Sequence, residues 1–170
     1  MHYHYCPTCG AKTENRPAGD DGQVPYCTTC QKFLFDTFFT CTITLVANPQ
    51  NKVALLTQNY MSTDFKTLVS GYMKPGESAE ESAIREVREE LGLSVDSIAL
   101  KKTMWFDRGG MLMVAFLARV NEDEFALSSE VDEAHWYDAA QALGLVHPDG
   151  PGNASYYLVK TFLEELSREN

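Results

Sequence analysis

Three glutamates recur at helical spacing between residues 86 and 90. Glu86, Glu89 and Glu90 stand at positions i, i+3 and i+4, which puts them on one face of a helix. Like charges this close repel, and a cation between them would reverse the sign of that interaction. Oxygen ligands on a rigid helix suit Mg2+ or Mn2+, which can also bind the oxygens of a substrate phosphate. A solvated acidic face is the alternative interpretation of these glutamates taken alone.

Four of the five cysteines form two C-x2-C pairs, Cys6 with Cys9 and Cys27 with Cys30, separated by 17 residues. Each pair lets two thiolates reach one ion, so the pairs together predict a tetrahedral, structural Zn2+ site. Disulfides are disfavoured because no secretory signal is visible. A thioredoxin-like redox site needs only one C-x-x-C, at the start of a helix. Cys41 lies in an apolar strand and is expected to be a buried small hydrophobe.

The glutamates require a helix to position them, and one is predicted over residues 78–91. Ser78 and Glu81 can form a capping box at its start, and Gly92 follows its expected end. Apolar residues recur every fourth position and would pack on the core, namely Ala79, Ala83, Val87 and Leu91. The glutamates therefore lie on a different face from the core contact.

The elements around this helix are predicted to be mostly strands. Strands are expected over residues 38–48, 53–58, 66–70, 98–106, 111–120 and 135–138. The first two should form a hairpin around the turn at residues 48–51. A closing amphipathic helix is expected over residues 156–166. Strands interleaved with two helices predict a mixed sheet with helices on both faces.

The stretch from residue 71 to 93 carries a family resemblance. It reads GYMKPGESAEESAIREVREELGL. Its spacing resembles the Nudix box at every defining position, which are Gly71, Glu77, Arg85, Glu86, Val87, Glu89, Glu90, Gly92 and Leu93. The resemblance extends from about residue 38 to the C-terminus. It implies the Nudix α/β/α sandwich and hydrolysis of a nucleoside diphosphate linked to another moiety.

The resemblance also implies roles for single residues. In the family, glutamates that match Glu86, Glu89 and Glu90 bind divalent metal, here Mg2+ or Mn2+. The residue that matches Glu77 assists directly or through water, and the one that matches Arg85 usually holds a glutamate in place. A plain ion pair with a glutamate on the same helix is the alternative for Arg85. We expect Glu89 or Glu90 to accept the proton of the attacking water.

A four-cysteine ribbon directly before such a domain resembles the NADH pyrophosphatase group. Residues 130–137 look like that group's E-x-x-E-A-x-W-Y segment, whose first glutamate contributes to the metal site. This assigns a metal-site role to Glu130, with an exposed acidic loop residue as the alternative. Tyr72 matches an aromatic position that stacks on the nucleotide, although a strand tyrosine can also simply pack.

One loop departs from the pattern of that group. The group carries a signature close to SQPWPFP, but residues 103–109 read TMWFDRG here. Trp105 or Phe106 could stack on a base or nicotinamide, or could fill the core. The scaffold and the metal chemistry therefore carry over, whereas a preference for NADH does not follow.

Composition sets the organisation of the chain. Its 170 residues suffice for one domain with a small attachment, and residues 10–26 have a loop-like composition. Regular periodicity begins after the cysteine pairs, so we expect a zinc ribbon over 1–35 and, by the resemblance, a Nudix domain over 36–170. The 14 basic and 24 acidic residues give a net charge of -10, which disfavours a basic groove along a nucleic acid. No apolar stretch reaches the roughly 18 residues of a membrane span. We expect a cytoplasmic location, no membrane partner and, by resemblance, a homodimer.

Three functions remain open at this stage. The leading hypothesis is an Mg2+- or Mn2+-dependent pyrophosphohydrolase for a small dinucleotide or nucleoside diphosphate-X substrate such as NADH, NAD+ or ADP-ribose. The second is hydrolysis at the 5' end of NAD-capped RNA, a reaction that the resembled group performs. The residues through Phe35 carry three basic and three acidic charges, so the ribbon offers no basic surface for RNA. A non-catalytic nucleotide-sensing module is the third, disfavoured by the intact box.

Overall fold

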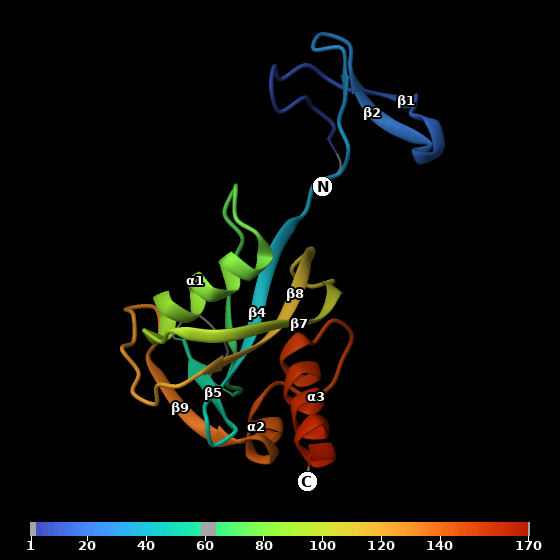
Figure 1. Ribbon diagram of the computed structural model, residues 1–170. Helices are drawn as coiled ribbons and strands as arrows, with labels where there is room; N and C mark the ends of the chain where they lie inside the picture. The colour runs from blue at the N-terminus through green and yellow to red at the C-terminus, as the bar shows by residue number, and fades with distance from the viewer. Residues whose placement is uncertain (1–2, 59–63, 170) are drawn as a thin grey trace. The chain divides into compact units, whose positions relative to one another are not determined.

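A computed structural model describes residues 3–58 and 64–169 of the chain (Figure 1). The chain divides into two compact units, Met1–Phe38 and Phe39–Asn170. Each unit has its own β-sheet. Within the described ranges, no helix is long and apolar enough to cross a membrane.

The smaller unit is a three-stranded antiparallel sheet. Its elements are β1 (Glu14–Pro17), the short 3-10 helix η1 (Gly19–Asp21), β2 (Gln23–Cys27) and β3 (Lys32–Phe33), with β2 in the middle. Residues 10–26, expected to be a loop, therefore contain β1 and most of β2. The prolines suggested a loop, but Pro17 ends β1, and the carbonyl of Pro25 still accepts a bond from the Leu34 amide at 2.8 Å.

The larger unit is built on a six-stranded mixed sheet. Its strands are β4 (Phe39–Ala47), β5 (Lys52–Thr57), β6 (Val69–Tyr72), β7 (Val95–Phe106), β8 (Met111–Val120) and β9 (Glu133–Asp138). They run in the order β7-β8-β4-β5-β9, and β6 pairs with β4. Only β4 and β8 are parallel among these pairs. The predicted hairpin of the first two strands is confirmed by the pairing of β4 with β5.

Helices cover both faces of this sheet, which confirms the predicted fold class (Figure 1). The helices are α1 (Ala79–Leu91), α2 (Ala139–Leu145) and α3 (Ala154–Glu169). Alternate residues of β4 point to opposite faces. Leu45 joins the core cluster of α2 and α3, which contains Phe162, whereas Val46 joins the α1 cluster, which contains Val87.

Two elements differ from the sequence prediction. Helix α2 is additional to the two helices that the sequence predicts. Its seven residues have no side-chain cap and are too few for a clear periodicity. It is stabilised by burial of Ala139 and Ala142. The strand expected over 66–70 is β6, two to three residues later, because Lys66 and Thr67 form only isolated bridges with Val146 and Leu56.

One edge of β4 is divided between two strands. β6 pairs with Cys41–Thr44, in the first half of β4, whereas β5 is paired with it only at Ala47 and Val53. The chain leaves β6 at Tyr72 and enters α1 at Ala79, after six intervening residues. The glutamate-bearing helix is thereby anchored beside this divided edge.

The start and end of α1 follow the sequence signals. The Ser78 side chain accepts a bond from the Glu81 amide, and the Glu81 carboxylate accepts one from the Ser78 amide, which completes the predicted capping box. Gly92 ends the helix in the left-handed conformation at φ 72°, and its amide donates to the Arg88 carbonyl. A side chain at 92 would also meet Ala126. The helix bounds are thus fixed by local chemistry.

The cap predicts a measurable loss of stability. Ser78→Ala should lower the free energy of unfolding by about 1 kcal/mol, since one amide of the first turn loses its acceptor. Urea denaturation followed by circular dichroism measures the change. Ser167→Ala is the matched control, because this exposed hydroxyl only donates back to the Leu163 carbonyl inside α3. Equal stability of the two variants would contradict a role for the cap.

Candidate metal centres and substrate cavity

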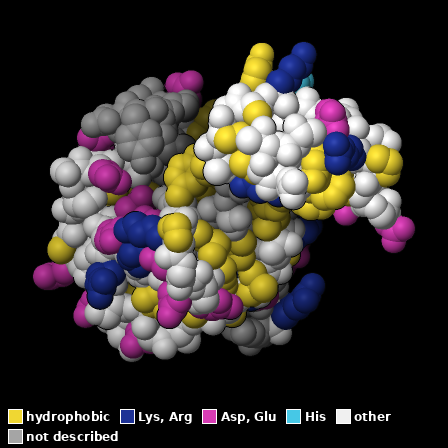
Figure 2. All heavy atoms as spheres, turned by 90° about the horizontal axis from the view of Figure 1, so that it is seen from above, with side chains coloured by type: hydrophobic (Ala, Val, Ile, Leu, Met, Phe, Trp, Pro, Cys, Tyr) yellow, Lys and Arg dark blue, Asp and Glu magenta, His cyan; other side chains and the backbone are white. Residues whose placement is uncertain are grey.

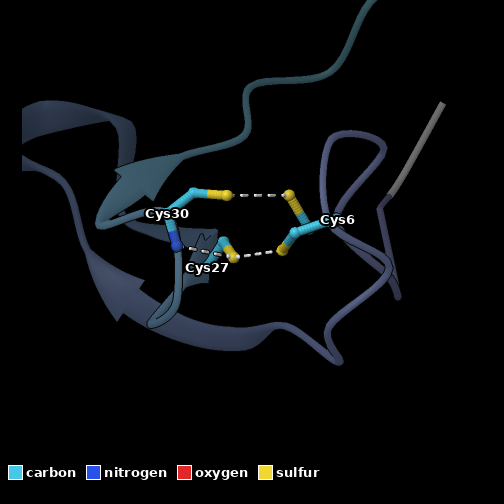
Figure 3. A group of neighbouring side chains, drawn as sticks. Cys6, Cys27 and Cys30 are labelled. Atoms are coloured by element: carbon cyan, nitrogen blue, oxygen red, sulfur yellow. Dashed lines mark hydrogen bonds between the residues drawn. The ribbon is translucent and has the colours of Figure 1, made fainter.

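The four paired cysteines converge in the smaller unit. Their sulfur atoms all lie within 4.8 Å of one another. The Sγ atoms of Cys6 and Cys30 are 3.9 Å apart, and those of Cys9 and Cys27 are 3.5 Å apart. Figure 3 shows the sulfurs of Cys6, Cys27 and Cys30 pointing toward one another. A tetrahedron with Zn–S bonds of about 2.3 Å has sulfurs about 3.8 Å apart, so the cluster fits a Zn2+ ion.

The surroundings of this cluster indicate a structural site. The Cys6 and Cys27 side chains are buried, and the Cys30 amide donates to the Cys27 sulfur at 3.3 Å. Among the described residues of this unit, Leu34 is the one further buried member of the same apolar cluster. Units below about 40 residues usually need a metal or disulfides to stay folded. None of the five cysteines, Cys41 included, forms a disulfide.

A second site lies in the larger unit, beside the divided edge of β4. A cavity of about 1030 Å³ there is lined by four of the predicted metal-site residues, Glu86, Glu89, Glu90 and Glu130. The first three come from α1, and Glu130 comes from the loop before β9. Figure 2 shows acidic and basic side chains interspersed on the drawn face, with hydrophobic side chains gathered beside them. The fold thus brings Glu130 to carboxylates that lie 40 to 44 residues earlier in the sequence.

Gly71 makes room for one of these carboxylates. A Cβ atom at position 71 would overlap the carboxylate group of Glu86. The backbone of Gly71 is not left-handed, so the requirement is space rather than conformation. The first residue of the motif is therefore small because β6 and α1 pack closely here.

Arg85 connects the carboxylates to one another. Its guanidinium donates to both oxygens of Glu77 at 2.5 and 3.0 Å, to Glu86 at 2.5 Å and to Glu89 at 2.9 Å. It also donates to the Tyr72 carbonyl at 3.2 Å. The two interpretations of Arg85 therefore coexist, because it pairs with Glu89 on its own helix and also holds more distant groups.

This pairing sets the charge of the groups involved. Hydrogen bonds from Arg85 lower the pKa of Glu77 to about 2, helped by the Lys74 amide at 2.9 Å. The same guanidinium lowers the pKa of Glu89, and Glu77 in turn raises the pKa of Arg85. These groups are therefore charged at neutral pH.

Glu90 is the buried member of the set. Its side chain is only 3% exposed, and burial, with the nearby charge of Glu86, raises its pKa to about 7. Its Oε1 accepts a bond from Gln58 at 3.1 Å. Its Oε2 is also buried but has no hydrogen-bond partner within the described part of the chain. A buried carboxylate oxygen without a donor, among other carboxylates, fits the ligand set of Mg2+ or Mn2+.

The aromatic residues predicted to contact the substrate differ in whether they line the cavity. Tyr72 lines the cavity, is 55% exposed, and meets Phe39 edge-on with ring centroids 5.5 Å apart. Phe106 also lines the cavity, next to Met111. Trp105 is 46% exposed and is not among the described residues that line the cavity. Both candidates of the altered 103–109 stretch lie at the end of β7 rather than in a loop, and the structure places Phe106 at the cavity.

Several cavity residues were not identified from the sequence. Gln58 and Lys66 come from the end of β5 and the segment that bridges it. His147, whose ring lies 4.9 Å from that of Phe65, and Asn153 come from the loop before α3. These residues have no shared spacing in the sequence, so only the fold brings them together.

The family follows from a comparison with known proteins. Residues 38–158 match the NUDIX domain family. The chain belongs to the Nudix family. The resemblance of the 71–93 stretch is thereby confirmed, and with it the class of Nudix hydrolases.

Curated relatives of this Nudix protein share a common name. An NAD-capped RNA hydrolase of Caenorhabditis elegans is 33% identical over 144 residues, 82% of this chain and 38% of the relative. One of Vibrio atlanticus is 28% identical over 135 residues, 79% of this chain and 49% of the relative. One of Pongo abelii is 26% identical over 151 residues, 85% of this chain and 33% of the relative. The chain spans less than half the length of these three relatives.

Solved structures agree on the fold. A NUDIX hydrolase from Nitrosomonas europaea superposes with a TM-score of 0.68 at 16% identity, over 93% of this chain and 91% of that one. The NUDIX domain of Shewanella oneidensis NrtR, crystallised with ADP ribose, gives 0.64 at 16% identity, over 83% and 94% of the two chains. At these identities the likeness shows the Nudix fold alone.

The cysteine cluster predicts a specific response to losing one ligand. Cys27→Ser should lower the zinc content from one equivalent per chain to near zero, because three thiolates leave the shell open. The smaller unit should then be cut rapidly by trypsin. Metal analysis and limited proteolysis measure both effects. Cys41→Ala, in the other unit, should keep its zinc, and full zinc retention by Cys27→Ser would contradict the site.

The close packing at Gly71 predicts that a substitution there weakens metal binding but leaves the stability of the fold nearly unchanged. Gly71→Ala should push the Glu86 carboxylate away, and a flexible side-chain end can move at little cost in folding energy. The melting temperature should therefore stay within a few degrees, whereas Mn2+ binding should weaken several-fold. Thermal denaturation and a Mn2+ titration measure the two quantities. Unchanged Mn2+ affinity would show that Glu86 is not a ligand.

Proposed function

We propose that this Nudix protein is a divalent-metal-dependent pyrophosphohydrolase of dinucleotide or nucleoside diphosphate-X substrates, of the NADH, NAD+ and ADP-ribose type. One observation carries the proposal. Three of the motif glutamates, Glu86, Glu89 and Glu90, together with Glu130, line one cavity of about 1030 Å³. Ligand sites usually have volumes of about 300–1000 Å³, so this one has space for a dinucleotide.

The residues have distinct roles in this proposal. Glu86, Glu89, Glu90 and Glu130 hold Mg2+ or Mn2+, and Arg85 keeps the first two of them in place through its hydrogen bonds. When bound, the metal would neutralise diphosphate oxygens and lower the pKa of the attacking water. Glu89 or Glu90 accepts the proton of that water.

Glu77 has a supporting role. Both of its oxygens bind Arg85, and one also accepts a bond from the Lys74 amide. It therefore fixes the guanidinium that the other carboxylates share, rather than offering a free oxygen of its own. The role that the family resemblance implies for Glu77, assistance directly or through water, stays a prediction beside this contact with Arg85.

The reaction balances without a further reactant. The water oxygen forms a bond to one phosphorus of the diphosphate, and the bond from that phosphorus to the bridging oxygen breaks. The products are two phosphate monoesters, and the proton of the water passes to the carboxylate. Tyr72 and Phe106, at the cavity, are the proposed contacts for the bases or the nicotinamide ring.

Hydrolysis by purified protein tests the proposal. NADH, NAD+, ADP-ribose, FAD, diadenosine polyphosphates and nucleotide sugars are supplied with Mg2+ or Mn2+, and the nucleotide products are separated by chromatography. Glu89→Gln and Glu90→Gln should each lower kcat by about 100-fold or more, since a ligand and proton acceptor is removed. Glu80→Gln is the control, because this exposed glutamate of the same helix lies outside the cavity lining. Full activity of both Glu89→Gln and Glu90→Gln would contradict this mechanism.

The 5' end of NAD-capped RNA is the second candidate substrate. The names of the curated relatives favour it, as three of them are NAD-capped RNA hydrolases. The net charge of -10 disfavours a long track for RNA, so any contact would be confined to the cap and the first nucleotides. A kcat/KM for capped RNA above that for NAD+, falling steeply with salt, would favour this substrate. The homodimer and the cytoplasmic location stay predictions.

A further inference from the structure

Gln58 is a buried amide that contacts the cavity. It follows the last residue of β5 and is only 2% exposed. Its Nε2 donates to Glu90 Oε1 at 3.1 Å, across 32 residues of sequence. The amide nitrogen, and not the amide oxygen, faces Glu90, so the charged carboxylate accepts this hydrogen bond. The orientation of Gln58 is therefore determined by its neighbour.

Hydrogen bonds on two sides fix the main chain just before Gln58. The Leu56 amide donates to the Thr67 carbonyl at 2.9 Å, and the reciprocal bond is 3.0 Å. On the other side, the Thr57 carbonyl accepts from the Asp132 amide at 2.9 Å. The amide of Gln58 is thus presented from a fixed strand end, opposite a residue of α1.

This contact makes the two oxygens of Glu90 unequal. Oε1 has a donor in Gln58, and no hydrogen bond of good geometry reaches the buried Oε2 in the ranges that the structure describes, although the nearby Ser70 amide also lowers the pKa of Glu90. Glu86 and Glu130 are close enough for their charges to act on Glu90. One oxygen of Glu90 is therefore occupied, and the other is left for a cation.

We propose that Gln58 is a positioning residue of the cation site: by holding Glu90 Oε1, it fixes the carboxylate so that Oε2 is the oxygen that binds the divalent ion. The proposal rests on the proposed function, because it concerns the same site. A partner that orients a metal ligand typically changes metal affinity by about 10- to 100-fold when it is removed. A buried amide with a purely structural role would change only folding stability.

The matched pair of variants is Gln58→Met and Asn48→Leu, each an apolar replacement of similar size. Asn48 is also buried, at 3% exposure, and its Nδ2 donates to the Asp123 carboxylate at 2.7 Å. It is not among the described residues that line the cavity. Both variants remove a buried amide-to-carboxylate bond, so both should lose stability. Only Gln58→Met should change the affinity for a cation.

The measurement is a titration with Mn2+ alone, in which electron paramagnetic resonance reports the free ion. Gln58→Met should bind Mn2+ about tenfold more weakly than the unmodified protein, with Asn48→Leu within twofold of it. An affinity of folded Gln58→Met within twofold of the unmodified protein overturns the inference and leaves the proposed function standing. No Mn2+ binding by the unmodified protein overturns both.

A second measurement needs no variant to fold. The chain has five glutamines, and the four others lie outside the described cavity lining. In protein labelled with 15N-glutamine, Mg2+ should shift the side-chain amide signal of Gln58 more than the other four. If the Gln58 signal shifts no more than the others do, the inference fails. The full chain with its zinc is used in both measurements.

Discussion

The larger unit depends on holding several carboxylates in one place although they repel. Arg85 meets this constraint with one guanidinium, which donates to Glu77, Glu86 and Glu89. Three features of the fold serve the same arrangement. The capping box sets where α1 begins, Gly71 leaves room for a carboxylate beneath the helix, and the divided edge of β4 opens the cavity. Without the guanidinium of Arg85, the same glutamates would be a cluster of repelling charges and not an ordered site.

Local signals in the sequence were enough to predict the helix and its cap. Ser78, Glu81 and Gly92 act through bonds within a few residues of themselves, so the structure reproduces what their order predicts. The glutamates could be placed on one face for the same reason. The contact of Gln58 with Glu90 spans 32 residues and depends on how β5 ends against α1, which no local pattern records.

Trp105 and Phe106, the two aromatic residues at the end of β7, illustrate another limit. Neighbouring strand residues point to opposite faces, so one of Trp105 and Phe106 had to face the cavity. Which of the two residues faces the cavity depends on the register of β7 with β8. That register is irregular between Leu100 and Lys102. A shift of one residue exchanges the two faces, and such a bulge cannot be read from composition. Likewise, the cysteines of the smaller unit predict its zinc ribbon. Its strands were not predicted, because the prolines and glycines between the cysteine pairs are typical of a loop.

Glu90 lies where the cavity meets the hydrophobic core. It is nearly as buried as Val87 and Leu91 on the same helix, and burial of a carboxylate opposes its charged form. An apolar side chain of similar size would suit this environment better when no cation is present. Selection for thermal stability alone would therefore drive position 90 away from glutamate, and selection for hydrolysis would retain it. Among the residues that the structure describes, Glu90 is the one buried charged side chain, so the trade-off between stability and activity falls on its carboxyl group.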